Sequence, residues 1–167
     1  MNWIANTDTI ILEPKFNKEL DINLISIYTK LIFSNYVLNE KLFEYYTNGT
    51  YYDFKFEKNQ FDQDVSNLFQ GITHLIFGYY FNQDVSKLPH SLTNLTFGSL
   101  FNQDISKLPH SLTHLTFGRK FNKDVSILPP NLTQLTFGHS FNKNLSKLPH
   151  SLTHLKFGYA FNKDVSN

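Results

Sequence analysis

Phenylalanine returns every twenty residues in the larger part of this 167-residue chain, and each one opens a near-copy of the same segment. The period is kept without a slip at Phe61, Phe81, Phe101, Phe121, Phe141 and Phe161. Self-similarity at a period of roughly 20–50 residues indicates a solenoid, in which each repeat is one coil stacked on its neighbours. The chain is therefore predicted to be a solenoid, and its function is expected on an extended surface rather than in a buried active site.

Within one coil, the segment Leu112–Phe117 predicts a short strand. Its last residues alternate with period two, which places Leu115 and Phe117 inside and leaves His114 and Thr116 outside. The proline before this segment disfavours helix, so the return path is expected to be extended or a short 3₁₀ turn. Stacked coils then place their strands about 4.8 Å apart in one parallel sheet.

The first sixty residues repeat the strand pattern in a degenerate form. Strand ends at Leu12, Phe33, Phe56, Phe77 and Phe97 are spaced 21, 23, 21 and 20 residues apart. We therefore predict one domain, a curved parallel sheet of about eight short strands with little α-helix. Residues 1–60 are its degenerate N-terminal coils or cap, and residues 61–167 are its regular repeats. An unrelated N-terminal cap of about fifty residues is the alternative.

Composition argues against several classes of protein. The net charge is +1, and the fifteen basic and fourteen acidic side chains are scattered singly along the chain. A nucleic-acid-binding protein usually presents a basic stripe, so no nucleic-acid partner is expected. The chain has no apolar run of membrane-spanning length and no secretory signal pattern, so no membrane partner is expected either. The absence of cysteine fits a reducing compartment, and the cytoplasm is the expected location.

The recurring pattern L-P-x-S-L-x-x-L-x-F-G-x-x-F-N resembles the FNIP repeat, a relative of the leucine-rich repeat. The resemblance covers residues 61–167 strongly and residues 1–60 weakly. The residues after Phe-Asn and the shorter repeat length depart from the family pattern. The resemblance implies a leucine-rich-repeat-like solenoid similar to proteins of social amoebae and of giant amoebal viruses, and the host cytoplasm if the chain is viral. Some such proteins carry an F-box that recruits ubiquitin ligases, but residues 1–60 show no F-box pattern.

Two polar rows recur at the coil corners. The first is Asn82, Asn102, Asn122, Asn142 and Asn162, extended by Asp62. We interpret it as an amide ladder, in which each side chain bonds backbone groups at the corner and the amide of the next coil. The second is Asp64, Asp84, Asp104, Asp124 and Asp164. Its D-x-S pattern favours Asx turns. A calcium row is the alternative, but these coils lack the glycines of tight ligand turns.

Histidine and threonine recur at exposed strand positions without forming a ligand set. His74, His114 and His154 share one position, but intervening coils keep them roughly 10 Å apart, too far for one Zn²⁺. Three threonines at a neighbouring position stack as in ice-binding solenoids, although ordinary strand propensity accounts for them. The sequence contains no evident nucleophile–base pair and no phosphate-binding glycine loop. We therefore predict no cofactor, no metal and no enzymatic activity.

Coil-to-coil variation gathers at two surface positions, which are the candidate partner-binding residues. The first set, called the sheet strip, is His74, Asn94, Thr96, His114, Thr116, Gln134, Thr136, His154 and Lys156. The second set, called the glycine-turn column, is Tyr79, Tyr80, Arg119, Lys120, His139 and Tyr159. Their aromatic, amide and basic groups are of the kinds enriched at protein interfaces. Drift at unconstrained positions is the alternative interpretation.

The sequence predicts a non-catalytic protein-interaction module whose protein partner it does not identify. One alternative is a structural element that assembles through its solenoid ends. Another is a ubiquitin-ligase substrate adaptor without a recognisable F-box. Because Asn167 lies only seven residues into a coil, we expect further sequence or a partner, possibly a second copy, against the last rung.

Overall fold

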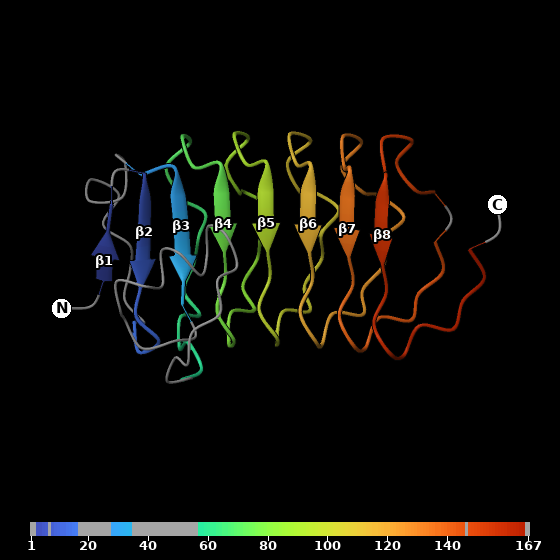
Figure 1. The fold of residues 1–167 in the computed structure, drawn as a ribbon, viewed down its shortest axis with the longest axis horizontal. Coiled ribbons are helices and arrows are strands. Elements are labelled where there is room, and N and C mark those ends of the chain that lie inside the picture. Colours follow the sequence, from blue (N-terminus) through green and yellow to red (C-terminus); the bar gives the residue numbers. More distant parts are fainter. Residues whose placement is uncertain (1–2, 7, 17–27, 35–56, 146, 166–167) are drawn as a thin grey trace.

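The computed structural model describes residues 3–6, 8–16, 28–34, 57–145 and 147–165. These residues form one sheet of eight short strands joined by turns and extended segments, without an α-helix (Figure 1). The strands are β1 (Trp3–Ala5), β2 (Thr9–Leu12), β3 (Lys30–Phe33), β4 (His74–Ile76), β5 (Asn94–Thr96), β6 (His114–Thr116), β7 (Gln134–Thr136) and β8 (His154–Lys156). In the described part of the chain, no helix is long and apolar enough to cross a membrane.

The strands follow one another across the sheet in sequence order, and β2 to β8 are parallel. Each regular coil pairs with the next in the same register, so that Leu95 lies opposite Leu115 and Thr96 opposite Thr116. This arrangement confirms the predicted parallel solenoid. It also confirms the inward and outward residues, because Leu115 is 1% exposed and its two neighbours in β6 are only partly buried.

Two features of the N-terminal part differ from the prediction. β1 pairs antiparallel with β2 and was not expected, because a three-residue strand has no periodic copy elsewhere in the chain. β3 pairs directly with β4, with Lys30 opposite His74, so no rung lies between them in the sheet. The rung predicted to end at Phe56 lies outside the described residues. The strand predicted to end at Phe33 is confirmed as β3.

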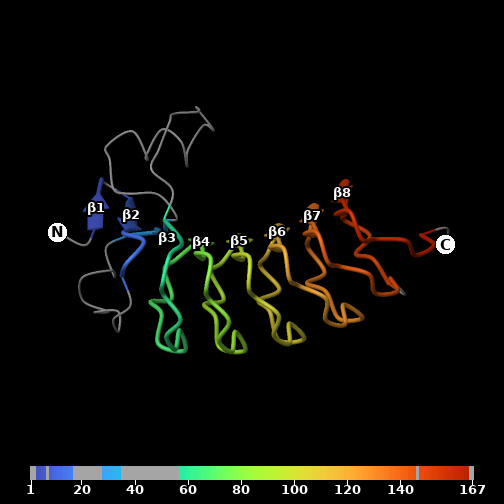
Figure 2. The same cartoon turned by 90° about the horizontal axis from the view of Figure 1, so that it is seen from below.

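The coils fan into a shallow arc. Figure 2 shows the strands along the inner side of this arc and the turns on the outer side. The outer path consists of extended segments and single turns such as Leu88 N–H to Val85 C=O and Leu92 N–H to Pro89 C=O. The predicted 3₁₀ turns are therefore isolated turns, and the extended part of that prediction is confirmed.

Two ladders of stacked phenylalanine rings run through the core. One contains the residue after each strand, with successive rings 5.6–5.8 Å apart from Phe77 to Phe157. The other contains the phenylalanine at each coil corner, with rings 6.0–6.2 Å apart from Phe61 to Phe161. Within each regular coil the two rings stack at 3.6–3.8 Å. These contacts bind each coil to itself and to both neighbours.

The same ring pair is kept in the coil that begins with β3, although its two members are far apart in the chain. Phe33 stacks on Phe61 at 4.0 Å, across 28 residues instead of the usual four. Buried Asn59 restores the register there, because its Nδ2 donates to the carbonyls of Glu13 and Ser34 and its Oδ1 accepts the N–H of Phe61. The ring stacking and the Asn59 hydrogen bonds therefore fix where the first regular repeat begins.

The glycine after each strand allows the coils to approach closely. A Cβ added at Gly118 would lie 2.0 Å from the carbonyl oxygen of Gly98 in the preceding coil. No side chain fits between these backbones, so the recurring glycine reflects close backbone approach.

Candidate binding surface of the sheet and the glycine turns

The sheet strip lies on the inner face of the arc, opposite the phenylalanine core. From β4 to β7 the middle residue of each strand is buried in the core, and the two flanking residues face the other way. The register aligns the first residues of the strands in one column and the third residues in another. The predicted strand residues are thus brought together on one continuous surface. They are half-buried on β4 to β6, whereas Gln134, His154 and Lys156 are exposed.

A second ladder beneath this surface orients the histidines and was not anticipated from the sequence. The backbone N–H groups of Thr113 and His114 donate to the carbonyl oxygen of Thr93 at 2.9 and 3.0 Å, and the Thr113 hydroxyl lies 3.1 Å from the same oxygen. The same pattern recurs at residues 73, 93, 133 and 153. The threonine that precedes every strand from β3 to β8 was the available signal, because a side chain with no structural contact is free to vary between coils.

These hydroxyls also set the histidine tautomer. The Thr113 Oγ1 lies 2.8 Å from the Nδ1 of His114. The hydroxyl of Thr113 has one proton, which it donates to the Thr93 carbonyl because a carbonyl can only accept. The contact between Oγ1 and His114 is then a hydrogen bond when Nδ1–H of the histidine donates to Oγ1. The Nε2 atom is then an acceptor that points away from the backbone. His74 and His154 have the same contact at 2.9 Å.

The electrostatic environment differs along the histidine column. Burial lowers the pKa of His74, and the nearby Lys30 ammonium lowers it further. Lys30 donates to the Asp8 carboxylate at 2.9 Å. Hydrogen bonds from Thr9 and then Lys30 lower the pKa of Asp8. His74 is therefore neutral at pH 7, and the β4 end of the strip presents an uncharged acceptor.

The strip is hollowed between β7 and β8. An open hollow of about 440 Å³ is lined there by Gln134, Leu135, Thr136, Thr153, His154, Leu155 and Lys156. Its mixed polar and apolar lining and its wide opening suit a partner's side chain better than an enclosed small molecule. This end of the sheet strip is also its most exposed part.

The glycine-turn column contains paired aromatic and basic groups. Tyr79 and Tyr80 meet edge to face at 5.0 Å, and the Lys58 ammonium lies 4.5 Å from the centre of the Tyr79 ring. His139 stacks on Tyr159 at 5.5 Å, and Tyr159 is 89% exposed. Arg119 and Lys120 are exposed, whereas both tyrosines of the first pair are half-buried. The structure thus aligns the column, but Tyr79 and Tyr80 offer less free surface than expected.

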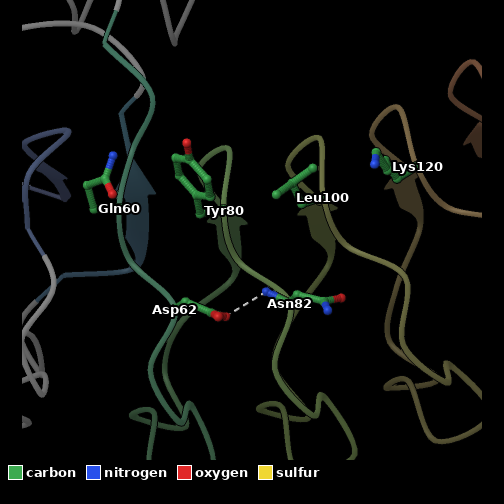
Figure 3. A pocket seen from close by; sticks show the side chains of 6 residues that line it. All are labelled: Gln60, Asp62, Tyr80, Asn82, Leu100 and Lys120. Carbon is green, nitrogen blue, oxygen red and sulfur yellow. Dashed lines mark hydrogen bonds between the residues drawn. The ribbon is translucent and has the colours of Figure 1, made fainter.

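A groove follows the column on its outer side. Figure 3 shows Gln60, Tyr80, Leu100 and Lys120 in one row, with Asp62 and Asn82 in a parallel row. These six residues border an open groove of about 420 Å³ that crosses four coils. The sequence analysis singled out Tyr80 and Lys120 without recognising that they border a groove.

The two polar rows at the corner stabilise the solenoid. Each asparagine backbone N–H donates to the side-chain oxygen twenty residues earlier at 2.8–3.2 Å, and Asp62 provides the first acceptor. The amide ladder is therefore confirmed. Asx turns are confirmed at Asp64, Asp84, Asp104 and Asp124, where the N–H and hydroxyl of the serine two residues on donate to the carboxylate.

Those hydrogen bonds have an electrostatic consequence. The Ser66 backbone N–H and then its hydroxyl lower the pKa of Asp64, and the Ser86 hydroxyl and then its N–H lower the pKa of Asp84. The pKa of the other two carboxyls is lowered in the same way, with the serine hydroxyl as the largest cause. Across the described ranges, no group of three or more acidic, histidine or cysteine side chains is arranged to hold a metal ion.

The sequence model of the FNIP repeat matches residues 55–100, 84–120, 101–138 and 121–160 of this chain. The chain belongs to the FNIP repeat family. No curated protein matches it. Among solved structures, it is similar to CroV588 of a giant virus, described as a novel circular LRR protein structure, with 35% sequence identity and a TM-score of 0.75. The match covers 95% of this chain and 22% of CroV588, so the chain spans about a fifth of that protein's length.

The FNIP chain thus has a leucine-rich-repeat-like solenoid fold, which generally serves as a protein-interaction scaffold and is typically non-catalytic. Its last described coil leaves Phe157 and Phe161 partly exposed and Val165 51% exposed. Self-association through this rung stays a prediction, as does a ligase contact made by residues 1–60.

Proposed function

We propose that this FNIP repeat chain is a non-catalytic module that binds a protein partner through the sheet strip and the glycine-turn column. The observation that carries this proposal is that each coil contains structural positions that recur and surface positions that vary. Core rings, glycines, the amide ladder and the threonine ladder recur from coil to coil, whereas the side chains of these two surfaces vary. Repeat proteins use a constant frame of this kind to present an extended binding surface to their partners.

The chemistry of the two surfaces supports the proposal. Tyr159 and Arg119 are exposed, and both residue types are over-represented among the side chains that dominate binding energies. The neutral imidazole of His74 offers an acceptor at Nε2, and Lys156 offers a donor beside the hollow at β8. A partner therefore meets apolar, donor and acceptor groups within one surface.

The rigidity of the surface also favours binding. Each strand of the strip is hydrogen-bonded to the next through backbone groups and through threonine hydroxyls such as that of Thr113. The backbone that carries the strip's side chains is therefore held in place before a partner binds. Less conformational freedom is then lost on association. The inward curve seen in Figure 2 is suited to the convex surface of a folded partner.

The test is affinity purification from the native cell with matched variants. A variant carrying Tyr80→Ala, Arg119→Ala and His154→Ala should lose co-eluting proteins that the native chain retains. A control variant carrying Lys87→Ala and Lys107→Ala changes exposed side chains outside both surfaces and should retain them. A binding partner that is kept equally by all three chains would refute the proposed surface.

A further inference from the structure

The structure gathers lysines that look isolated in the sequence. Lys123, Lys143 and Lys163 are twenty residues apart, and stacking places them in one exposed column at the coil corner, called here the lysine column. Residues 119–167 contain seven basic and two acidic side chains, whereas residues 1–118 contain eight basic and twelve acidic ones. Residues 119–167 therefore carry more basic than acidic side chains.

This column replaces a structural contact by a free charge. In earlier coils the same position is glutamine, and the side-chain amides of Gln83 and Gln103 donate to backbone carbonyls of the preceding coil at 3.2 and 2.9 Å. Lysine forgoes that contact and places like charges on successive rungs, where they repel one another. Within the described part of the chain, ion pairs join Lys15 to Glu57 and Lys30 to Asp8, and the basic side chains of residues 119–163 form none.

The asparagines next to the column add uncharged donors. Asn122 and Asn142 use their Oδ1 atoms to accept the backbone N–H of the following coil. Each Nδ2 group is left as a donor with no partner among the described residues. The corner therefore presents ammonium and amide donors side by side, which suits a ligand rich in anionic acceptors.

The groove of Figure 3 leads into this corner. Its apolar part is formed by Tyr80 and Leu100, and Lys120 lies at its end, three residues before Lys123 in the chain. The groove runs across successive coils, along the axis of the solenoid. An extended chain lying in it would continue over Lys123 toward Lys163.

The spacing of the lysine column favours an extended polypeptide as the ligand. The phenylalanines two residues before the lysines have ring centroids 6.1 and 6.0 Å apart. In an extended strand, side chains at i and i+2 share one face and lie about 6.6–6.8 Å apart.

We propose that the lysine column and the adjoining groove bind an extended acidic segment of a partner protein. Alternate carboxylates of that segment contact Lys123, Lys143 and Lys163, and the Asn Nδ2 groups donate to the oxygens that remain free. An apolar residue of the segment packs on Tyr80 and Leu100. This site lies outside the sheet strip and shares Tyr80 and Lys120 with the glycine-turn column.

The test measures binding of fluorescent peptides to the purified full chain by anisotropy. The probe alternates Glu and Thr over about twelve residues, which at about 3.3 Å per residue spans the column and the groove. A Gln/Thr peptide of equal length is its neutral control. We expect the Glu/Thr peptide to bind at low salt, to weaken as salt rises, and to bind at least about tenfold more tightly than the neutral peptide.

Three variants separate this site from charge in general. Lys123→Gln, Lys143→Gln and Lys163→Gln together restore the residue that the chain itself uses at position 83, so the fold is retained and binding should fall about tenfold or more. Replacing lysines 87, 107 and 147 by Gln removes the same charge elsewhere and should leave binding within about twofold. Gln103→Lys extends the column and should tighten binding.

Several results would overturn the proposal. These are no binding of the Glu/Thr peptide by the native chain, equal binding of the Gln/Thr peptide, and full binding by the variant without the lysine column. Tighter binding of a single-stranded oligonucleotide of equal charge would assign the column to nucleic acid instead. A variant carrying Arg119→Ala in the glycine-turn column and His154→Ala in the sheet strip should bind the acidic peptide within about threefold, so loss of the proposed partner surface is distinguishable from loss of the lysine column.

Discussion

The amide ladder predicts that removal of an asparagine destabilises the coil that follows it. The Oδ1 of Asn102 accepts the backbone N–H of Asn122 at 3.0 Å, and Asn102→Ala removes this acceptor while the donor stays half-buried between coils. A net hydrogen bond contributes about 0.5–1.5 kcal/mol, and a buried donor without a partner costs about 1–3 kcal/mol. Because water reaches this corner in part, we expect a loss of about 1–2 kcal/mol in the free energy of unfolding.

Two matched variants test the reason for that loss. Asn102→Asp keeps the acceptor, as Asp62 does for the N–H of Asn82 at 2.8 Å, and should cost less than about 0.5 kcal/mol. Asn162→Ala removes an Oδ1 that accepts no backbone N–H within the described residues, and should also cost less than about 0.5 kcal/mol.

Urea unfolding followed by far-ultraviolet circular dichroism measures these free energies, and amide hydrogen exchange reports on the Asn122 N–H directly. We expect faster exchange of that one amide in Asn102→Ala and near-native exchange in Asn102→Asp. An equal loss of stability in Asn162→Ala would show that asparagine acts within its own coil, and the ladder would not be the cause.

Three further predictions follow from the packing and the Asx turns. Gly118→Ala places a Cβ 2.0 Å from the Gly98 carbonyl oxygen and should cost about 2–4 kcal/mol by urea unfolding, whereas a loss below about 0.5 kcal/mol would contradict the close approach. Phe101→Ala empties a fully buried site and should cost about 3–5 kcal/mol, and half-buried Phe161→Ala clearly less; equal losses would contradict the ladder. The lowered aspartate pKa values in the folded chain stabilise it above the unfolded-state value near 4, and this contribution is lost as the pH falls through the lower folded-state values. The thermal midpoint should therefore drop below about pH 4, and less steeply when the serines of the four Asx turns are replaced by Ala; an unchanged slope would refute the assignment.

The structure of the periodic part could be predicted from the sequence because equivalent residues in neighbouring coils are always twenty positions apart. Leu115 and Phe117 were placed inside from period-two alternation, and both are buried. The asparagine row was interpreted as a ladder, and the hydrogen bonds join residues twenty apart. Before residue 61 the same argument located the strands that end at Leu12 and Phe33, but it missed the strand Trp3–Ala5, which pairs antiparallel.

The surfaces were predicted less completely than the core. The sheet strip and the glycine-turn column were located, since outward positions follow from the same alternation. The threonine ladder beneath His114, the groove beside Tyr80 and the lysine column were missed. These three features depend on which side chains of different coils lie close together. The order of residues along the chain does not show that proximity.

The twenty-residue period by itself determined the solenoid, its inward phenylalanines and its corner ladder, because a repeated local pattern leaves one stacking register that buries every copy. Only the tertiary structure decided that Phe33 packs on Phe61 and that β3 pairs with β4. The twenty-residue period does not hold between these residues, so packing alone selects the partners. The tertiary structure also decided that Lys123, Lys143 and Lys163 form one charged column. Stacking brings corner rings that are twenty residues apart in the chain to 6.0–6.1 Å from one another.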